Sequence, residues 1–225
     1  MIKTAILVDG GFYLKRAKNM WGNKPPKERA DELFNYCLRH LKWHGECSEL
    51  YRIFYYDCPP AEKEVYNPLL DQTINLKNTD TYKWSKEFHE FLKAKRKLAL
   101  RMGELSEKQT NYNFKYETFK KLCTKKITVD ELTINDLELN VTQKGVDMKI
   151  GLDISSLSYK RLVNQIILIS GDSDFVPAAK HARREGIDFI LDPLWMKVKP
   201  GLREHIDGMR TCCDKPSVID SNSDD

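Results

Sequence analysis

Hydrophobic and polar positions alternate along this chain with two periods, and the changes of period predict a series of strands and helices. Short apolar runs rich in Ile, Leu, Val and aromatic residues predict buried strands, whereas apolar residues at helical spacing predict amphipathic helices. The predicted strands cover residues 4–8, 50–56, 98–105, 165–169 and 187–191. The predicted helices cover residues 12–18, 28–43, 81–95, 146–159 and 174–184.

Strands that alternate with helices in this way favour an α/β fold, in which helices cover both faces of a parallel sheet. Right-handed crossovers limit the strand order, and the simplest order places strand 4–8 beside strand 165–169. We expect one domain over residues 1–211, with a less regular insertion at about residues 60–142. The polar segment 212–225 predicts a disordered tail.

Composition indicates the size class, possible partners and compartment of the protein, but it says little about the chemistry of a site. The chain has 225 residues, of which 41% are hydrophobic and 31% charged, and this fits a single domain with a buried core. A net charge of +4 permits a nucleic-acid partner without requiring one. The six cysteines show no CxxC spacing, which favours reduced thiols and a cytoplasmic location. We see no signal-peptide pattern and no apolar run long enough for a membrane span, so we expect no membrane partner.

The most informative polar positions are aspartates at the ends of two predicted strands. Asp9 follows strand 4–8, and Asp172 and Asp174 follow strand 165–169. In open parallel sheets, sites form where the carboxyl ends of strands meet. Each aspartate alone has an ordinary explanation, because Asp9 could belong to a turn and Asp174 could cap a helix. Their occurrence together predicts a site for a hard cation such as magnesium.

A further carboxylate comes from the predicted helix 146–159. Asp147 lies in its first turn, next to the buried stripe, where a lone carboxylate would ordinarily interact with the helix dipole. Asp153 lies six residues later, about 9 Å further along the helix axis, so the two cannot easily bind one ion together. We therefore expect Asp147 to be a ligand and Asp153 either to support a ligand indirectly or to be structural.

Other kinds of site are less well supported by the sequence. It contains no GxxxxGK[ST] loop, no GxGxxG fingerprint and no GxSxG elbow. Its Asp-x-Asp pair follows a late strand, whereas a haloacid-dehalogenase-type phosphatase carries one after the first strand. His40 and His44 have a spacing that can bind zinc, but the glutamate of HExxH is absent and a surface helix face is the favoured interpretation. An incidental thiol pair is favoured over a redox sensor for Cys212 and Cys213.

Three segments resemble the NYN domain, a PIN-like nuclease group that includes the bacterial LabA-like proteins. They are Val8-Asp9-Gly10-Gly11, Lys144-Gly145-Val146-Asp147 and Ser170-Gly171-Asp172-Ser173-Asp174-Phe175. The resemblance covers the chain in order and is weakest between about residues 60 and 140. It implies a PIN-like three-layer α/β/α sandwich with a mostly parallel central sheet, an acidic site for Mg²⁺ or Mn²⁺, and cleavage of RNA.

The resemblance also assigns roles to individual residues. Asp9, Asp147, Asp172 and Asp174 match the acidic positions of the family and would act as metal ligands and catalytic residues. We expect substrate contacts from Lys144, Lys149, Ser170 and Ser173, although both lysines could equally be solvated residues at a helix start. One departure is Gly11-Phe12, where many members carry an asparagine.

Two function classes follow from this comparison. The complete acidic set favours a metal-dependent ribonuclease, whereas the missing asparagine favours a non-catalytic regulatory protein that binds RNA or a protein partner. Residues 111–126 contain basic and aromatic side chains that could hold single-stranded RNA, although an ordinary amphipathic helix explains them equally well. The sequence leaves the oligomeric state open, a homodimer included.

Overall fold

The structure is a computed structural model that describes residues 1–43, 45–106 and 110–216. It confirms the predicted α/β fold: six parallel strands form a central sheet in the order β14-β13-β12-β1-β4-β7. The strands are β1 (Lys3–Asp9), β4 (Glu49–Asp57), β7 (Leu98–Met102), β12 (Gln165–Ile169), β13 (Asp188–Asp192) and β14 (Gly208–Met209).

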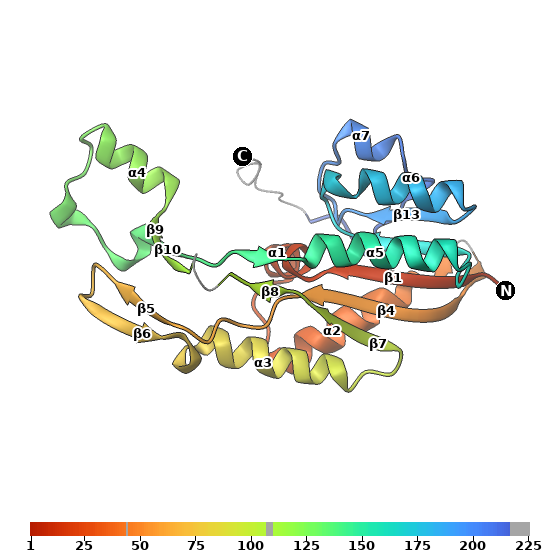
Figure 1. The fold of residues 1–225 in the computed structure, drawn as a ribbon, viewed down its shortest axis with the longest axis horizontal. Helices are drawn as coiled ribbons and strands as arrows, with labels where there is room; N and C mark the ends of the chain where they lie inside the picture. The colour runs from red at the N-terminus through yellow and green to blue at the C-terminus, as the bar shows by residue number, and fades with distance from the viewer. Residues whose placement is uncertain (44, 107–109, 217–225) are drawn as a thin grey trace. The chain divides into compact units, whose positions relative to one another are not determined.

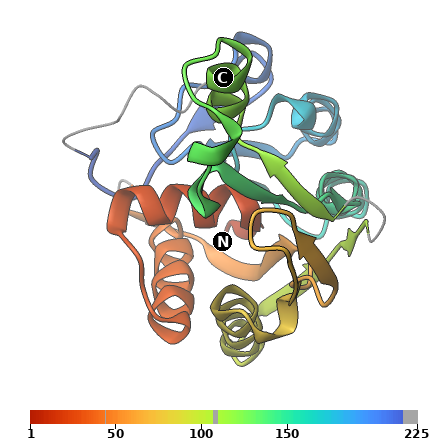
Figure 2. The ribbon, with the colours of Figure 1, turned by 90° about the vertical axis from the view of Figure 1, so that its left-hand side faces the viewer.

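Helices cover both faces of this sheet, which gives the three layers of a PIN-like sandwich. Helices α5 and α6 lie on one face, and α1 and α2 lie on the other (Figure 1, Figure 2). The helices are α1 (Gly10–Trp21), α2 (Pro26–Arg39), α3 (Asp80–Lys93), α5 (Val146–Tyr159), α6 (Val176–Arg184) and the short α7 (Pro200–Arg203). A two-stranded hairpin, β2 (Lys42–Trp43) and β3 (Glu46–Cys47), follows α2.

The two central strands explain where the site lies. The side chains from Ala5 to Val8 in β1 and all those of β12 are buried, as expected for strands covered on both faces. The two strands pair in parallel, with Val8 opposite Ile169. This pairing confirms the predicted neighbours and brings Asp9 and Ser170 to the same edge of the sheet.

The chain divides into two compact units. The first consists of residues 1–57, 87–102 and 145–225, within which the sheet lies, and the second of residues 58–86 and 103–144. The second half of α3 and all of β7 therefore belong with the sheet, inside the stretch where sequence predicts a continuous insertion. The reason is apolar packing: Phe88 packs edge-on against Tyr55 of β4, and β7 pairs with β4 along its length.

The second unit is built from short pieces. Its strand pairs are β5 (Glu64–Asn67) with β6 (Gln72–Asn75), β8 (Glu104–Leu105) with β11 (Gln143–Lys144), and β9 (Asn111–Phe114) with β10 (Leu137–Asn140). Its helical pieces are α4 (Tyr116–Cys123), the start of α3, and 3₁₀ turns at Leu76–Asn78, Val129–Glu131 and Ile134–Asp136. In α4 the side chains of Tyr116 and Phe119 are exposed.

The end of the described chain differs from the predicted disordered tail at 212–225. The backbone amide of Cys212 donates to the Tyr36 hydroxyl at 3.2 Å, and the carbonyl of Cys213 accepts from the Trp195 indole at 3.1 Å. Two side chains of the first unit thus hold Cys212 and Cys213, at the start of the segment predicted to be disordered. Residues 217–225 lie outside the described part of the chain.

No helix among the described residues combines the length and the apolar character that a membrane span requires.

Candidate functional site

Asp9 stands where β1 ends and α1 begins. Its backbone is extended, and its Oδ1 accepts the amide of Phe12 at 3.1 Å, which makes it the N-cap of the helix. The other oxygen, Oδ2, accepts the hydroxyl of Ser170 at 3.2 Å. The cap that ordinary turn chemistry predicts is therefore present, and the same side chain also reaches across to the next strand.

Two residues after β12, Asp172 begins the second acidic segment. The amide of Asp172 donates to Ser170 Oγ at 3.3 Å, and Asp172 Oδ1 accepts the amide of Asp174 at 2.9 Å. These bonds open the 3₁₀ turn η5 (Ser173–Phe175), which leads into α6. Both carboxylates are exposed, whereas Ser170 beneath them is fully buried. Ser170 thus connects the two acidic segments.

The charges of neighbouring predicted aspartates act on the pKa values of Asp9 and Asp147. Burial, followed by the charges of Asp147 and Asp172, raises the pKa of Asp9 to about 6, against the opposing effect of hydrogen bonds from the Phe12 amide and the Ser170 hydroxyl. The pKa of Asp147 is also raised, first by desolvation and then by the charges of Asp172 and Asp174. The structure therefore brings Asp9, Asp147, Asp172 and Asp174 into one electrostatic cluster, which we call the aspartate cluster.

Asp153, six residues after Asp147 in α5, has different partners. It forms a bidentate ion pair with Arg101 at 2.7 and 2.6 Å and accepts the Tyr56 hydroxyl at 2.8 Å. Both of these partners are on strands of the sheet, β7 and β4, which supports a structural role for Asp153. This agrees with the sequence, in which Asp153 lies too far along the helix axis from Asp147 for the two to bind one ion easily.

Two of the four predicted substrate contacts, Ser170 and Lys149, already have hydrogen-bond partners within the protein. The ammonium of Lys149 donates to the carbonyl of Met102 at 2.7 Å, an interaction that fixes α5 to the end of β7. Lys144 belongs to β11 in the second unit. Ser173 lies in η5 between the two exposed carboxylates. Contact of these residues with a substrate remains a prediction.

The donor chemistry of the cluster suits a hard divalent cation, since it consists of carboxylates whose mutual repulsion a cation would relieve. The residues described contain no group of three or more His, Cys, Asp or Glu side chains already arranged around a metal position. A cation there would therefore complete its shell with water and phosphate oxygens, as Mg²⁺ commonly does. The site fits an ion held by few protein ligands at a time.

Two further aspartates end neighbouring strands, and sequence reasoning missed both. Asp57 ends β4 and lies 3.1 Å from His89 Nε2, and it accepts the Tyr55 hydroxyl at 3.2 Å. Asp192 ends β13 and is fully buried. An aspartate after an apolar run was the available signal for both, because it is the same signal that identified Asp9 and Asp172.

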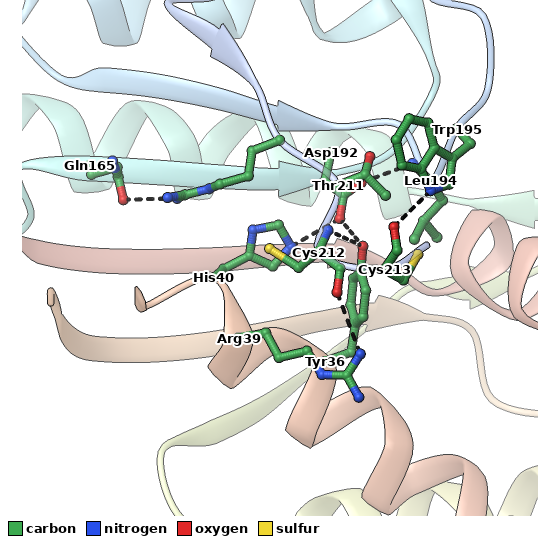
Figure 3. Close-up of polar contacts among 11 residues, drawn as sticks. Tyr36, Arg39, His40, Gln165, Asp192, Leu194, Trp195, Thr211, Cys212 and Cys213 are labelled. Carbon is green, nitrogen blue, oxygen red and sulfur yellow. Dashed lines mark hydrogen bonds and ion pairs between the residues drawn. The ribbon is translucent and has the colours of Figure 1, made fainter. Parts of the chain in front are cut away.

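Asp192 is the centre of a buried polar network (Figure 3). Its Oδ2 accepts the Tyr36 hydroxyl at 2.5 Å and lies 2.9 Å from His40 Nε2. Its Oδ1 accepts the Thr211 hydroxyl at 2.8 Å and the Leu194 amide at 2.9 Å. The predicted surface position of His40 is therefore wrong. Its side chain is buried and pairs with Asp192, which is 152 residues away in the sequence. His44, the second histidine of the rejected zinc pair, lies outside the described residues.

Glycines allow the two strand ends to approach each other. A Cβ on Gly10 would lie 2.5 Å from the backbone oxygen of Tyr56, so no larger residue fits there. A Cβ on Gly171 would lie 2.9 Å from the ring of Phe12. The ring of Phe12 thus packs beside the second acidic segment, in the stretch where many NYN sequences carry an asparagine.

The chain is similar to one protein family and to a solved structure. The sequence profile described as "NYN domain" matches residues 73–194. Among solved structures, a protein of unknown function from Vibrio parahaemolyticus RIMD 2210633 is 15% identical, with a TM-score of 0.44, over 92% of this chain and 91% of that one. A search of curated proteins found no match.

Proposed function

The chain belongs to the NYN domain family, a PIN-like nuclease group, and on this basis we propose that it is a metal-dependent ribonuclease. The observation that carries the proposal is the aspartate cluster at the carboxyl edge of the sheet. The charges of Asp172 and its neighbours help to raise the pKa values of Asp9 and Asp147, so these carboxylates are costly to keep together without a counter-charge. A bound divalent cation would offset this cost, as expected in an enzyme that needs such an ion.

In this proposal Asp9, Asp147, Asp172 and Asp174 hold Mg²⁺ or Mn²⁺ at the ends of β1 and β12 and at the start of α5. When bound, such an ion lowers the pKa of a water and stabilises negative charge on a phosphate that is being transferred. Ser170 orients the site, because its hydroxyl fixes Asp9 while its oxygen fixes the amide of Asp172. Ser173 and Lys144 are the proposed substrate contacts.

RNA is the proposed substrate, and the second unit supports it with a cationic, aromatic surface. Tyr116 and Phe119 of α4 are exposed, and exposed lysines accompany them in and after the helix. Aromatic faces with nearby cations suit unpaired nucleotides. The cytoplasm is the proposed compartment, since all six cysteines are free thiols in the structure.

One observation favours the alternative, a non-catalytic RNA- or protein-binding regulator. Phe12 packs beside Gly171 in the stretch where an asparagine would offer an amide to the substrate. A site that had lost this group could retain the fold and the acidic residues without turnover.

Cleavage of RNA by wild type and Asp172→Asn protein distinguishes the two functions. We expect wild type to hydrolyse mixed RNA in Mn²⁺ and to stop in EDTA, and we expect the variant to lose activity by orders of magnitude because an amide binds a hard cation poorly. Asp31→Asn is the matched control, since Asp31 is a surface aspartate of α2 paired with Lys95. Equal cleavage by all three proteins would remove Asp172 from the mechanism, and no cleavage by wild type would favour the regulator.

A further inference from the structure

A groove in the first unit presents two exposed tryptophans outside the aspartate cluster. Trp43 and Trp195 line it together with Met209, and their side chains are 44%, 38% and 45% exposed. Large apolar side chains gathered at one surface indicate a binding site rather than ordinary surface composition. The groove encloses about 680 Å³, which is within the range of small-ligand pockets. We call it the tryptophan groove.

We propose that the tryptophan groove binds single-stranded RNA by stacking nucleobases on Trp195 and Trp43. The inference rests on the proposed function in one respect, namely that RNA is the substrate. It goes beyond that function by assigning the strand state of the RNA and a binding surface separate from the aspartates.

The backbone that presents Trp195 is held in an unusual conformation. Leu194 and Trp195 both have positive φ angles, 45° and 66°, which residues other than glycine rarely adopt. Strain of this kind persists only where surrounding contacts enforce it, and it concentrates at functional sites. Here the Leu194 amide donates to Asp192 Oδ1, and the Leu194 carbonyl accepts from Arg16 at 2.8 Å.

The indole of Trp195 is fixed as well as its backbone. Its Nε1 donates to the carbonyl of Cys213 at 3.1 Å, while more than a third of the side chain stays exposed (Figure 3). An aromatic ring that is oriented before binding loses little entropy when a base stacks on it. The buried network around Asp192 therefore fixes the turn that carries Trp195.

The same network connects this turn to the aspartate cluster. The carbonyl of Asp192 accepts the amide of Ser170 at 3.2 Å, and the hydroxyl of Ser170 donates to Asp9. The turn follows β13, which is the direct neighbour of β12 in the sheet. The tryptophan groove thus begins one strand away from the cluster, on the same edge of the sheet.

The charge of the groove favours a polyanion. Among the described residues that line it, Lys197, Arg203 and Arg210 are cationic and none is acidic. The guanidinium of Arg210 lies 5.0 Å from the centre of the Trp43 ring, in a cation–π contact. Arg210 itself is buried, so the exposed Lys197 and Arg203 supply the positive charge beside the tryptophan faces, the combination used for single strands.

The geometry selects single-stranded RNA over a duplex. Stacking on a side chain requires a base whose face is free, and in a duplex the neighbouring base pairs occupy both faces. Stacking is tolerant of sequence, because every base has an aromatic face. We therefore expect a preference for strand state with little preference for sequence.

Equilibrium binding of short fluorescent RNAs tests the proposal, with Ca²⁺ present to neutralise the aspartates and a gel to verify that the RNA stays intact. The variants are Trp195→Leu, which removes the ring, and Trp195→Phe, which keeps an aromatic face. Tyr159→Ala is the matched control, because Tyr159 is an exposed aromatic residue of α5 in the same unit and lies outside the groove. Thermal midpoints show whether each variant is folded.

Wild type should bind single-stranded RNA more tightly than duplex RNA of the same length. Trp195→Leu should weaken single-strand binding by roughly 5- to 150-fold, the range for loss of one stacked base. Trp195→Phe should retain most of the affinity, and Tyr159→Ala should match wild type. RNA should also quench the tryptophan emission of wild type more than that of Trp195→Phe.

The inference and the proposed function can fail separately. Cleavage of RNA by a wild type whose affinity is unchanged in Trp195→Leu would overturn the inference and leave the function intact. Trp195-dependent binding without any cleavage would support the inference and overturn the function. A wild type without affinity for single strands overturns the inference and would leave the groove to a protein partner.

Discussion

Replacing Asp9 with asparagine should stabilise the metal-free protein at neutral pH. In the folded protein the pKa of Asp9 is raised from 3.8 to about 6, chiefly by burial and further by the charges of Asp147 and Asp172. The folded state therefore binds this proton more tightly than the unfolded state. The resulting stability is complete below pH 3.8 and is lost as the pH rises through 6.

The size of the effect follows from the shift. A pKa raised by about two units corresponds to roughly 3 kcal/mol of cost for the ionised form. Asparagine cannot ionise, and it caps a helix as well as aspartate does, so the bond from the Phe12 amide should survive. Because the bond from Ser170 is rearranged, we expect a net gain of about 1–3 kcal/mol at pH 7.5. At about 2–4 °C per kcal/mol, the midpoint should rise by several degrees.

Thermal and urea unfolding in EDTA, at pH 7.5 and pH 5, measures this gain. The gain should fall to about half at pH 5, since wild-type Asp9 is then largely protonated in the folded state. Asp153→Asn provides the contrast: it breaks the bidentate pair with Arg101 and should destabilise the protein at both pH values. A variant Asp9→Asn that is no more stable than wild type at pH 7.5, or equally stabilised at both pH values, would refute the reasoning.

Three further predictions concern the metal, the buried network and the second unit. Mn²⁺ should raise the thermal midpoint of wild type, because a ligand that binds only the folded state stabilises it, and should raise that of Asp172→Asn less; equal shifts would place the ion elsewhere. Asp192→Ala should cost about 3–5 kcal/mol in urea unfolding, since it leaves the buried groups of His40 and Tyr36 without their acceptor, and a cost below about 1 kcal/mol would contradict this account. Alanine at Lys120, Lys121, Lys125 and Lys126 should weaken RNA binding at every sequence and flatten its dependence on salt, whereas an unchanged salt slope would show that these lysines make no phosphate contacts.

The elements predicted best are those whose signals are local. Strand β12 and helix α5 have the bounds that their sequences predict, because one is a short apolar run and the other has a regular buried stripe at Val146, Ile150 and Ile154. By contrast, β14 is only two residues long and exists through its pairing with β13. No periodicity is visible in two residues, so the sixth strand could not be predicted.

The same distinction applies to the site. Asp9 and Asp172 could be predicted because each directly follows an apolar run, and sheet topology does the rest. Asp57 and Asp192 follow the same rule, yet they are buried against histidine and tyrosine from other helices. The rule identifies the edge of the sheet, but partners far away in sequence decide which aspartates face solvent.

The tryptophan groove could not be predicted from the sequence, because it also depends on residues that are far apart in the chain. Its side chains come from the hairpin after α2, the turn after β13 and the edge strand β14. None of these segments carries a recognisable motif. Only the fold brings Trp43, Trp195 and Arg210 together.

An anomalous-scattering map from crystals grown with Mn²⁺ tests the central claim most directly, which is that the aspartate cluster acts as one cation site. The account predicts a manganese peak within metal–oxygen bonding distance, about 2.0–2.6 Å, of carboxylate oxygens from at least one of Asp9 and Asp172 together with another member of the cluster. The peak should be lost or weakened in Asp172→Asn crystals. A wild-type map with no peak at the carboxyl edge of β1 and β12, or with a peak bound by other residues, would contradict the account.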